Sequence, residues 1–480
     1  MSELLNVEDI FASKVFTVAK MRERLPKKVF QEVTRVMEHG GELSMAAADV
    51  VAKAMKDWAV EHGATHYTHW FQPLTGITAE KHDAFVTHPD EEGKMLMDFS
   101  GKELIKGESD ASSFPSGGLR ATFEARGYTA WDITSPAFLK ESACGVILCI
   151  PTAFCSYTGE ALDKKTPLLR SMEALNEQAL RIVRLFGNTE AAKVTASVGA
   201  EQEYFLVDKD LFLQRKDLMF AGRTLFGAPA PKGQEMEDHY FGVIRERVGA
   251  YMKDLNEELW KLGVTAKTQH NEVAPAQHEI DFKYTDALHT ADNIETFKLV
   301  VKSIAKRHGL HASFMPKPVY GVPGSGMHIN MSLDDQDGNN IFGDPNDENG
   351  LSKEAYYFLA GLLKHAKGLM ALTNPLVNSY KRLITGHEAP RCIAWTSGNR
   401  SAMIRVPALR GEQTKFELRN PDCAGNPYLV LALLLEAGME GVCERLVPPA
   451  PVMNNIYDMT PEELDAAGIR ALPASLEEAV

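Results

Sequence analysis

The sequence has no apolar run that approaches the 18 or more residues of a transmembrane helix. The best candidate, residues 143–150, is short and is followed by Pro151. Basic residues are also few, since 51 Lys and Arg against 65 Asp and Glu give a net charge of −14, which argues against nucleic-acid and anionic-membrane binding. The first nine residues include three acidic ones and no basic n-region, so we expect no signal peptide.

Cysteine is sparse. The 480 residues include six cysteines and no CxxC pair, so we expect buried thiols in a reduced, cytoplasmic compartment. The sequence also lacks internal repeats and low-complexity tracts. What it does contain, 44% apolar and 24% charged residues, is typical of a soluble globular protein.

The order of predicted elements indicates an α+β protein of two domains. Residues 1–135 contain short mixed elements and many turns, and residues 136–480 alternate strand-like runs with amphipathic helices. Apolar stripes at helical spacing predict helices over 175–186 and 294–305. Asn426 followed by Pro427 predicts the N-cap and first residue of a third helix, which is apolar nearly all round and should be buried.

Two segments are predicted to be irregular. Residues 99–126 contain the stretch SSFPSGG, which fits neither helical nor strand periodicity, so we expect a long loop. Long loops inside compact domains are usually functional or disordered. Residues 222–233 are rich in Gly and Pro and are expected to form a surface excursion or flap.

Polar side chains recur at spacing two on three predicted strands. Because side chains alternate across a strand, residues two apart share one face. These rows are Glu201 and Glu203; His328, Asn330 and Ser332; and Lys415, Glu417 and Arg419. Carboxylates on such a face should not meet an apolar core, since burying a charge costs several kcal/mol without a partner. The alternative for any single row is a half-exposed strand with solvated charges.

A fourth segment, HNEVAPAQHE, adds Glu272 and Glu279. Their odd separation would place them on opposite faces of one straight strand, but a turn at Pro275 would bring both to one side. Five glutamates and one histidine then become candidates for a common site. Oxygen-rich ligation with one imidazole suits Mg²⁺ or Mn²⁺ better than zinc.

Cationic residues complement this acidic set. Between Asn378 and Asn420 the chain carries Lys381, Arg382, Arg400, Arg405, Arg410 and Arg419. Arginine holds anionic oxygens in bidentate fashion, and metals together with arginines indicate phosphoryl chemistry. No Walker-type phosphate loop is present, so a nucleotide would bind in another way. The histidines at 62, 66, 69 and 82 lack partners at ligand spacing and are expected to pack and form hydrogen bonds.

These residues lie in motifs that resemble the glutamine synthetase family along nearly the whole chain. The motifs, in order, are GAEQEYFLV, HNEVAPAQHE, GSGMHINMSL, NPLVNSYKRLITGHEAP, NRSAMIRVP and KFELRNPDCAGNPYL. Residues up to about 280 resemble the type III class, and residues from HEIDFKYTDA onward resemble type I. The resemblance implies an N-terminal β-grasp domain, a catalytic domain with a curved antiparallel sheet (glutamine synthetase/guanido kinase-like), and a homo-oligomeric ring with active sites between subunits.

The resemblance also implies a role for each motif residue. One metal would be held by Glu203, Glu272 and Glu279, and the other by Glu201, His328 and Glu417. The implied catalytic residues are Asp110, Glu388 and Arg400, with Ser113, Gly324, Arg382 and Arg419 binding substrate. The implied ATP-binding residues are Asn330, Ser332, Arg405 and Lys415, of which Asn330 and Lys415 stand where the family usually has His and Arg; Pro323 likewise replaces the usual Asn.

The implied reaction uses ATP, L-glutamate and ammonium with two or more Mg²⁺ or Mn²⁺ ions per subunit. ATP phosphorylates the γ-carboxylate of glutamate, and ammonia then attacks the acyl phosphate to give L-glutamine. Two other functions remain open for the same fold: a γ-glutamyl-amine (polyamine) ligase, and a catalytically silent structural or regulatory ring.

Overall fold

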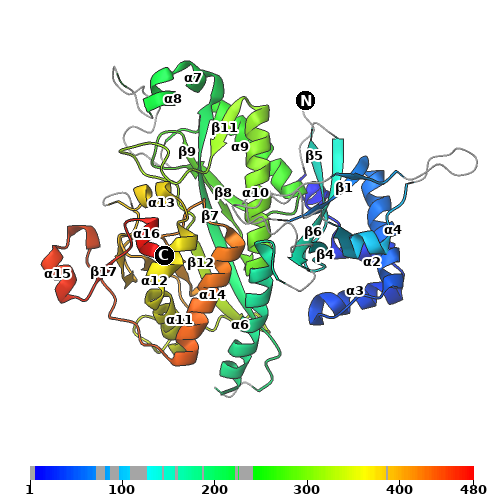
Figure 1. Cartoon of the computed structure of the whole chain (residues 1–480). Helices are drawn as coiled ribbons and strands as arrows, with labels where there is room; N and C mark the ends of the chain where they lie inside the picture. Colours follow the sequence, from blue (N-terminus) through cyan, green and yellow to red (C-terminus); the bar gives the residue numbers. More distant parts are fainter. Residues whose placement is uncertain are drawn as a thin grey trace, which may run out of the picture. The chain divides into compact units, whose positions relative to one another are not determined.

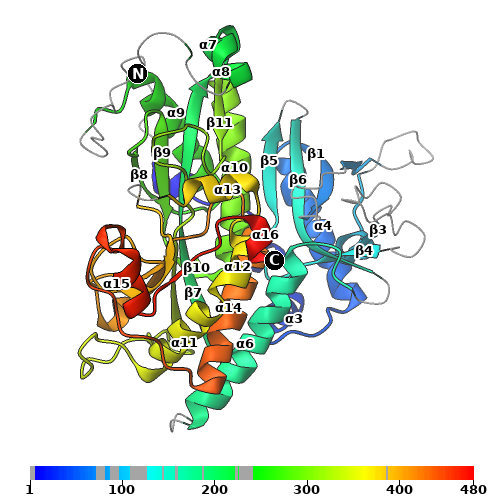
Figure 2. The ribbon, with the colours of Figure 1, turned by 60° about the vertical axis from the view of Figure 1, so that its left-hand side comes forward.

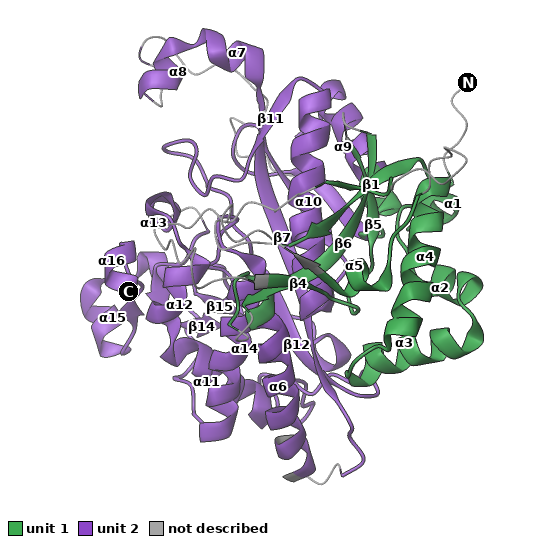
Figure 3. Ribbon diagram, turned by 45° about the vertical axis from the view of Figure 1, so that its right-hand side comes forward, with its two compact units in different colours: residues 1–167, 258–264 green, residues 168–257, 265–480 purple. Residues whose placement is uncertain are grey.

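The computed structural model divides the chain into two compact units, coloured separately in Figure 3: residues 1–167 with 258–264, and residues 168–257 with 265–480. It describes residues 6–71, 82–86, 97–108, 127–142, 145–156, 160–185, 189–221, 225, 242–384 and 388–480. The division falls at Pro167, later than the predicted boundary at 135. The reason is that the strands after residue 135 pair with strands before it.

The first unit contains a mixed sheet with helices beside it (Figure 1). Within the described residues the strand order is β2-β1-β6-β4-β3, and β5 also pairs with β6. The strands are β1 (Ala64–Trp70), β2 (Asp83–Ala84), β3 (Lys106–Glu108), β4 (Gly127–Trp131), β5 (Phe138–Ser142) and β6 (Gly145–Ser156). The helices are α1 (Val7–Ile10), α2 (Val18–Arg24), α3 (Lys27–His39), α4 (Met45–Glu61) and α5 (Gly101–Ile105). Helix α4 contributes Val51, Met55 and Trp58 to the core of this unit.

One expectation for this unit was wrong in part. The predicted loop over 99–126 begins with regular structure, because Ser100 and Glu103 form a capping box that starts α5 and Leu104 is buried. Pro151 lies inside a strand. Strand β6 continues through this proline, which lies where β6 changes partner from β5, paired up to Cys149, to β4, paired from Thr152.

The second unit is built on a larger sheet around the long strand β7 (Val194–Asp208) (Figure 2). In the described residues the strand order is β14-β15-β16-β12-β7-β9-β8, with β10 and β11 also pairing with β7. The other strands are β8 (Ala266–Asn271), β9 (Gln277–Phe282), β10 (Thr285–Asp286), β11 (Leu310–Ser313), β12 (Ile329–Asp335), β14 (Trp395–Thr396), β15 (Ile404–Arg405) and β16 (Phe416–Leu418). A separate pair is formed by β13 (Cys392–Ile393) and β17 (Arg470–Ala471).

The helices that accompany this sheet in the described residues are α6 (Lys165–Leu185), α7 (Lys209–Gln214), α8 (Lys216–Ala221), α9 (Glu246–Lys261), α10 (Ala287–Arg307), α11 (Lys353–Lys364), α12 (Ala366–Thr373), α13 (Val377–Arg382), α14 (Pro427–Glu444), α15 (Pro461–Ala466) and α16 (Leu476–Ala479). Apolar side chains of α6, α10, α11, α12, α13, α14 and α16 form one core with the sheet. The predicted helical stripes fall in α6 and α10. Asn426 caps α14 by accepting a hydrogen bond from the backbone N–H of Leu429, and α14 is largely buried, as predicted.

Strand β7 separates the core from the polar rows. Its residues Ala196, Val198 and Ala200 lie in the core under the helices, so the odd-numbered Glu201 and Glu203 point to the opposite face. The predicted surface excursion at 222–233 falls almost wholly outside the described residues. Among the helices of the described ranges, none combines the length and apolarity needed to cross a bilayer.

Candidate active site

Two groups of acidic and histidine side chains gather on the polar face of the β7 sheet. Glu201, His328 and Glu417 form one group, and the second consists of His270, Glu272 and Glu279. Within each group, one ligand atom from every residue lies within 4.8 Å of the others. The six residues come from β7, the residue directly before β12, β16 and the β8–β9 hairpin, so the tertiary fold assembles both groups.

Strand register brings these residues together. Glu203 on β7 is directly opposite Glu279 on β9, and Asn330 on β12 is opposite Glu417 on β16. The hairpin turn after Glu272 contains Pro275 and the positive-φ residue Ala276. This turn places Glu272 and Glu279 on one side despite their odd spacing.

His270 is a functional candidate that our sequence reasoning missed. Its Nε2 atom lies 3.3 Å from Glu279 Oε2, and its Nδ1 atom lies 3.8 Å from Glu272 Oε1. The signal was available, because His270 precedes Glu272 by two positions, the same spacing that identified the other polar rows.

Glu203 is buried between the two groups. Its Oε2 atom accepts hydrogen bonds from the backbone N–H of Gly326 at 2.6 Å and from Gln277 Nε2 at 3.2 Å. Its other carboxylate oxygen lies 3.9 Å from His328 Nδ1. Burial, followed by the nearby charge of Glu272, raises the pKa of Glu203 to about 8.

The pKa values of the neighbouring groups are shifted in both directions. Burial and then the charge of Glu203 raise the pKa of Glu279 well above its usual value. Burial, and then Arg419, lower the pKa of His328 well below its usual value, so the imidazole is neutral. Burial also acts to raise the pKa of Glu417, but Arg419 first and then His328 outweigh it, and the net shift is downward.

This donor set fits divalent cations. Buried carboxylates that repel one another take up protons unless a positive charge compensates them, and a neutral imidazole is a good ligand. Carboxylate oxygens with one imidazole in each group suit Mg²⁺ or Mn²⁺.

Three arginines adjoin the acidic groups. Arg405 and Arg419 both donate to the carboxylate of Glu417. Arg382 is 3% exposed and donates to the backbone oxygens of Asn420 at 3.1 Å and Arg419 at 3.2 Å. Arg419 is equally buried, and its Nε atom has no hydrogen-bond partner within the described ranges. An orphaned cationic donor at this position suits an anionic oxygen that a bound substrate would bring.

The remaining predicted residues are more open. Glu388 and Arg400 form a 3.0 Å ion pair with about half of each side chain exposed. Asn330 donates to Glu201 at 3.1 Å. Ser332 on β12 and Lys415, directly before β16, are half-buried. A Cβ at Gly324 would overlap the carbonyl oxygen of Pro316, so this position requires glycine. Asp110 and Ser113 lie outside the described residues.

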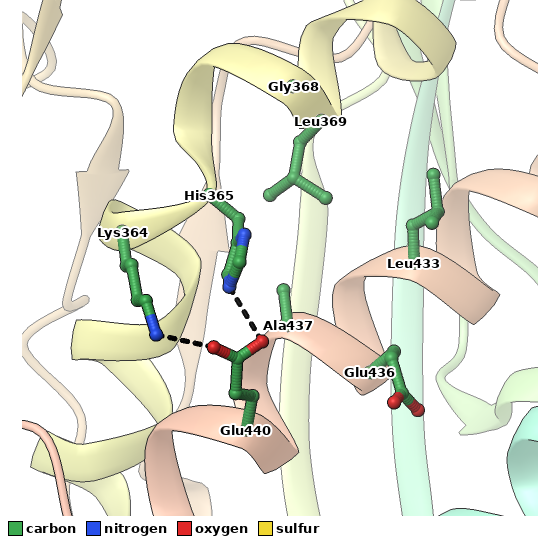
Figure 4. Close-up of a pocket in the computed structure, with 8 residues that line it drawn as sticks. All are labelled: Lys364, His365, Gly368, Leu369, Leu433, Glu436, Ala437 and Glu440. Atoms are coloured by element: carbon green, nitrogen blue, oxygen red, sulfur yellow. Dashed lines mark hydrogen bonds and ion pairs between the residues drawn. The ribbon is translucent and has the colours of Figure 1, made fainter. Parts of the chain in front are cut away.

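A separate surface cavity of about 320 Å³ lies between α11, α12 and α14 (Figure 4). Leu369, Leu433 and Ala437 form its apolar part, and Glu440 is paired with Lys364 and, at 2.8 Å, with His365. None of the predicted site residues lines this cavity, and much of its charge is already paired internally. This cavity is therefore separate from the two acidic groups on the β7 face.

Comparisons with known proteins identify the family of the chain. The family model "Glutamine synthetase, catalytic domain" matches residues 181–480, and "Glutamine synthetase type III N terminal" matches residues 7–171. The type-3 glutamine synthetase of Dictyostelium discoideum is 45% identical over 389 residues, which are 80% of this chain and 52% of that protein. The glutamine synthetase of Bacteroides fragilis is 49% identical over 336 residues, 70% of this chain and 45% of that protein.

The chain thus spans about half the length of these curated relatives. Among solved structures, Plasmodium falciparum glutamine synthetase aligns with a TM-score of 0.69 at 24% identity, covering 90% of this chain and 89% of that one, which shows the same fold. The mixed α/β architecture is therefore that of glutamine synthetases, as predicted. With the catalytic-domain model covering more than half of its residues, the chain belongs to the glutamine synthetase family.

Proposed function

We propose that this protein ligates ammonia to the γ-carboxylate of L-glutamate, using ATP and two or more Mg²⁺ or Mn²⁺ ions. The observation that carries the proposal is the gathering of the Glu201 and Glu279 groups around buried Glu203, next to buried arginines. The names of the curated relatives favour this function over the polyamine-ligase and silent-ring alternatives.

On this proposal the two groups hold the metals. Glu201, His328 and Glu417 would hold one ion, and Glu203, Glu272 and Glu279 the other, with His270 beside the second. The ions would neutralise the phosphates of ATP and the charge that develops during phosphoryl transfer. Asn330, Ser332, Arg405 and Lys415 would line the ATP side.

The arginines would bind and orient the anions. The unpartnered Nε of Arg419 supports a contact with an oxygen of the glutamate substrate or the transferred phosphoryl group. Arg400 would stabilise the transferring group, with Gly324 and Arg382 shaping the glutamate pocket. The carboxylate of Glu388 would shield the acyl phosphate from water and accept a proton from ammonium, so that ammonia attacks the acyl carbon and phosphate leaves.

The proposal includes partners. Asp110 and Ser113 would reach the ammonium site of a neighbouring subunit in a ring-shaped homo-oligomer, as the family resemblance implies. We place the reaction in the cytoplasm because the described cysteines are all free thiols. Nucleic acid and membrane are not expected partners of a chain with a net charge of −14.

The test compares wild type with Glu279→Gln and, as a control, Glu462→Gln, which changes an exposed glutamate of α15. Wild type should release phosphate from ATP only with glutamate, ammonium and Mg²⁺, and larger amines should not replace ammonium. At each site, Mg²⁺ at 100 times the dissociation constant of that site should stabilise wild type by about 2.7 kcal/mol. Glu279→Gln should lose phosphate release and the stabilisation from the site that Glu279 helps to hold, and Glu462→Gln should keep both. Phosphate release without glutamate, or a fully active Glu279→Gln variant, would contradict the proposal.

A further inference from the structure

A buried junction outside the predicted ligand sets connects the segments that carry them. The junction consists of Asp422 and Cys423, which follow β16 and are 0% and 3% exposed. Neither residue belongs to the metal groups or to the arginine set. Their contacts reach β7, the loop before β12, and the surroundings of Arg382.

Cys423 contacts both β7 and the loop before β12. Its thiol lies 2.9 Å from the carbonyl oxygen of Gly326 and 3.2 Å from that of Glu203, and it can donate its proton to either. The backbone N–H of Gly326 in turn donates to the Glu203 carboxylate at 2.6 Å. The thiol therefore ties together the two chain segments whose separation fixes the position of that carboxylate.

Asp422 interacts with Asn374 and with Arg382. Its carboxylate accepts hydrogen bonds from Asn374 Nδ2 at 3.0 Å and from the backbone N–H of Ala424 at 2.9 Å, and its charge acts on the guanidinium of Arg382. Asn374 also donates to the carbonyl of Asn420 at 2.7 Å, one of the oxygens that Arg382 uses. The carboxylate thus helps to fix the backbone that holds the guanidinium.

Backbone contacts make the junction rigid. Asp422 pairs with Gly326 in an isolated antiparallel bridge, and Met327 donates to the carbonyl of Pro421 at 3.0 Å. A Cβ at Gly326 would overlap the guanidinium of Arg382 and come within 2.9 Å of His328 Nε2. A small displacement of the backbone at Gly326 would therefore also move Arg382 and His328.

We propose that Asp422 and Cys423 are positioning residues that hold Glu203 and Arg382 at a fixed separation, and so set the geometry between the second metal and the glutamate pocket. The inference rests on the proposed metal-dependent function. Groups that orient metal ligands without touching the metal typically change affinity by 10- to 100-fold when removed.

The test measures Mn²⁺ binding to the full chain by the electron paramagnetic resonance signal of free Mn²⁺, without ATP or glutamate. Cys423→Ala removes the thiol and should weaken Mn²⁺ binding at one site, the one that Glu203 helps to hold, about tenfold. Cys423→Ser keeps a donor on a shorter bond and should give an intermediate affinity. The control is Cys149→Ala, which removes the same group from the 0% exposed core position in the first unit and should leave Mn²⁺ affinity unchanged.

Asp422→Asn provides an independent readout. It preserves shape but removes the charge that acts on Arg382, so the KM for glutamate should rise more than kcat falls, with Mn²⁺ affinity changed less than in Cys423→Ala. Unchanged Mn²⁺ affinity in both Cys423 variants, or an equal loss in Cys149→Ala, would overturn the positioning role. Absence of Mn²⁺ binding by wild type would instead overturn the proposed function itself.

Discussion

The crossing of α11 and α14 gives a quantitative prediction. Gly361 on α11 faces Gly441 on α14, and a Cβ added to Gly361 would overlap the carbonyl oxygen of Ala437 and lie 2.9 Å from the backbone nitrogen of Gly441. These are backbone atoms that cannot rotate away, so Gly361→Ala must push the helices apart. Gly368 on α12 is the matched control, because a Cβ added there would meet no atom within 4 Å.

The two substitutions should have opposite signs. Alanine in a helix is favoured over glycine by about 0.5–1 kcal/mol, so Gly368→Ala should stabilise the protein by that amount. Overpacking costs about 1–3 kcal/mol, and the rigid backbone contacts place Gly361→Ala toward the upper end. The variants should therefore differ by about 3 kcal/mol in the free energy of unfolding.

Thermal unfolding followed by circular dichroism measures this difference. For a unit of about 300 residues, 1 kcal/mol corresponds to roughly 1.6 °C, so the Tm of Gly361→Ala should lie about 5 °C below that of Gly368→Ala. Because α14 begins directly after the Asp422–Cys423 junction, Gly361→Ala should also weaken Mn²⁺ binding slightly. Equal Tm values for the two variants would refute the close helix contact and the reasoning built on it.

Two further predictions concern ion pairs of opposite character. Asp132 and Lys165 are buried and 2.7 Å apart. Burial acts to raise the pKa of Asp132, but the charge of Lys165 together with hydrogen bonds from Lys165, Thr134 and Ser135 makes the net shift downward. This stabilisation is present above the ordinary carboxyl pKa and is lost as pH falls through the lowered folded value. Asp132→Asn should therefore cost about 3–5 kcal/mol in urea unfolding at pH 7 and much less in acid; an equal cost at every pH would contradict the ion-pair explanation. The exposed pair Arg400–Glu388 contributes at most about 1 kcal/mol, so Arg400→Ala should barely change the Tm but reduce phosphate release at least about 100-fold, and unchanged activity would exclude the proposed role of Arg400.

Spacing along the chain was enough to predict most of the local structure of the site. Because side chains alternate across a strand, the spacing of Glu201 and Glu203 predicted that they share one face. Asn426 and Pro427 predicted the start of α14. Both patterns depend only on local backbone geometry. The turn at Pro275 likewise followed from local conformational preference. The roles of the individual residues remain predictions.

Other features of the site depend on the tertiary structure and have no local sequence signal. The pairing of Glu203 with Glu279 depends on the register between strands more than 70 positions apart, and the unpartnered Nε of Arg419 follows from which atoms surround it after folding. Asp422 and Cys423 carry no periodic signal, since their importance comes from contacts with three other segments. The sequence by itself determined which side chains share a face, because that is a property of one strand; only the fold determined which faces meet, because burial and long-range pairing act on the whole chain.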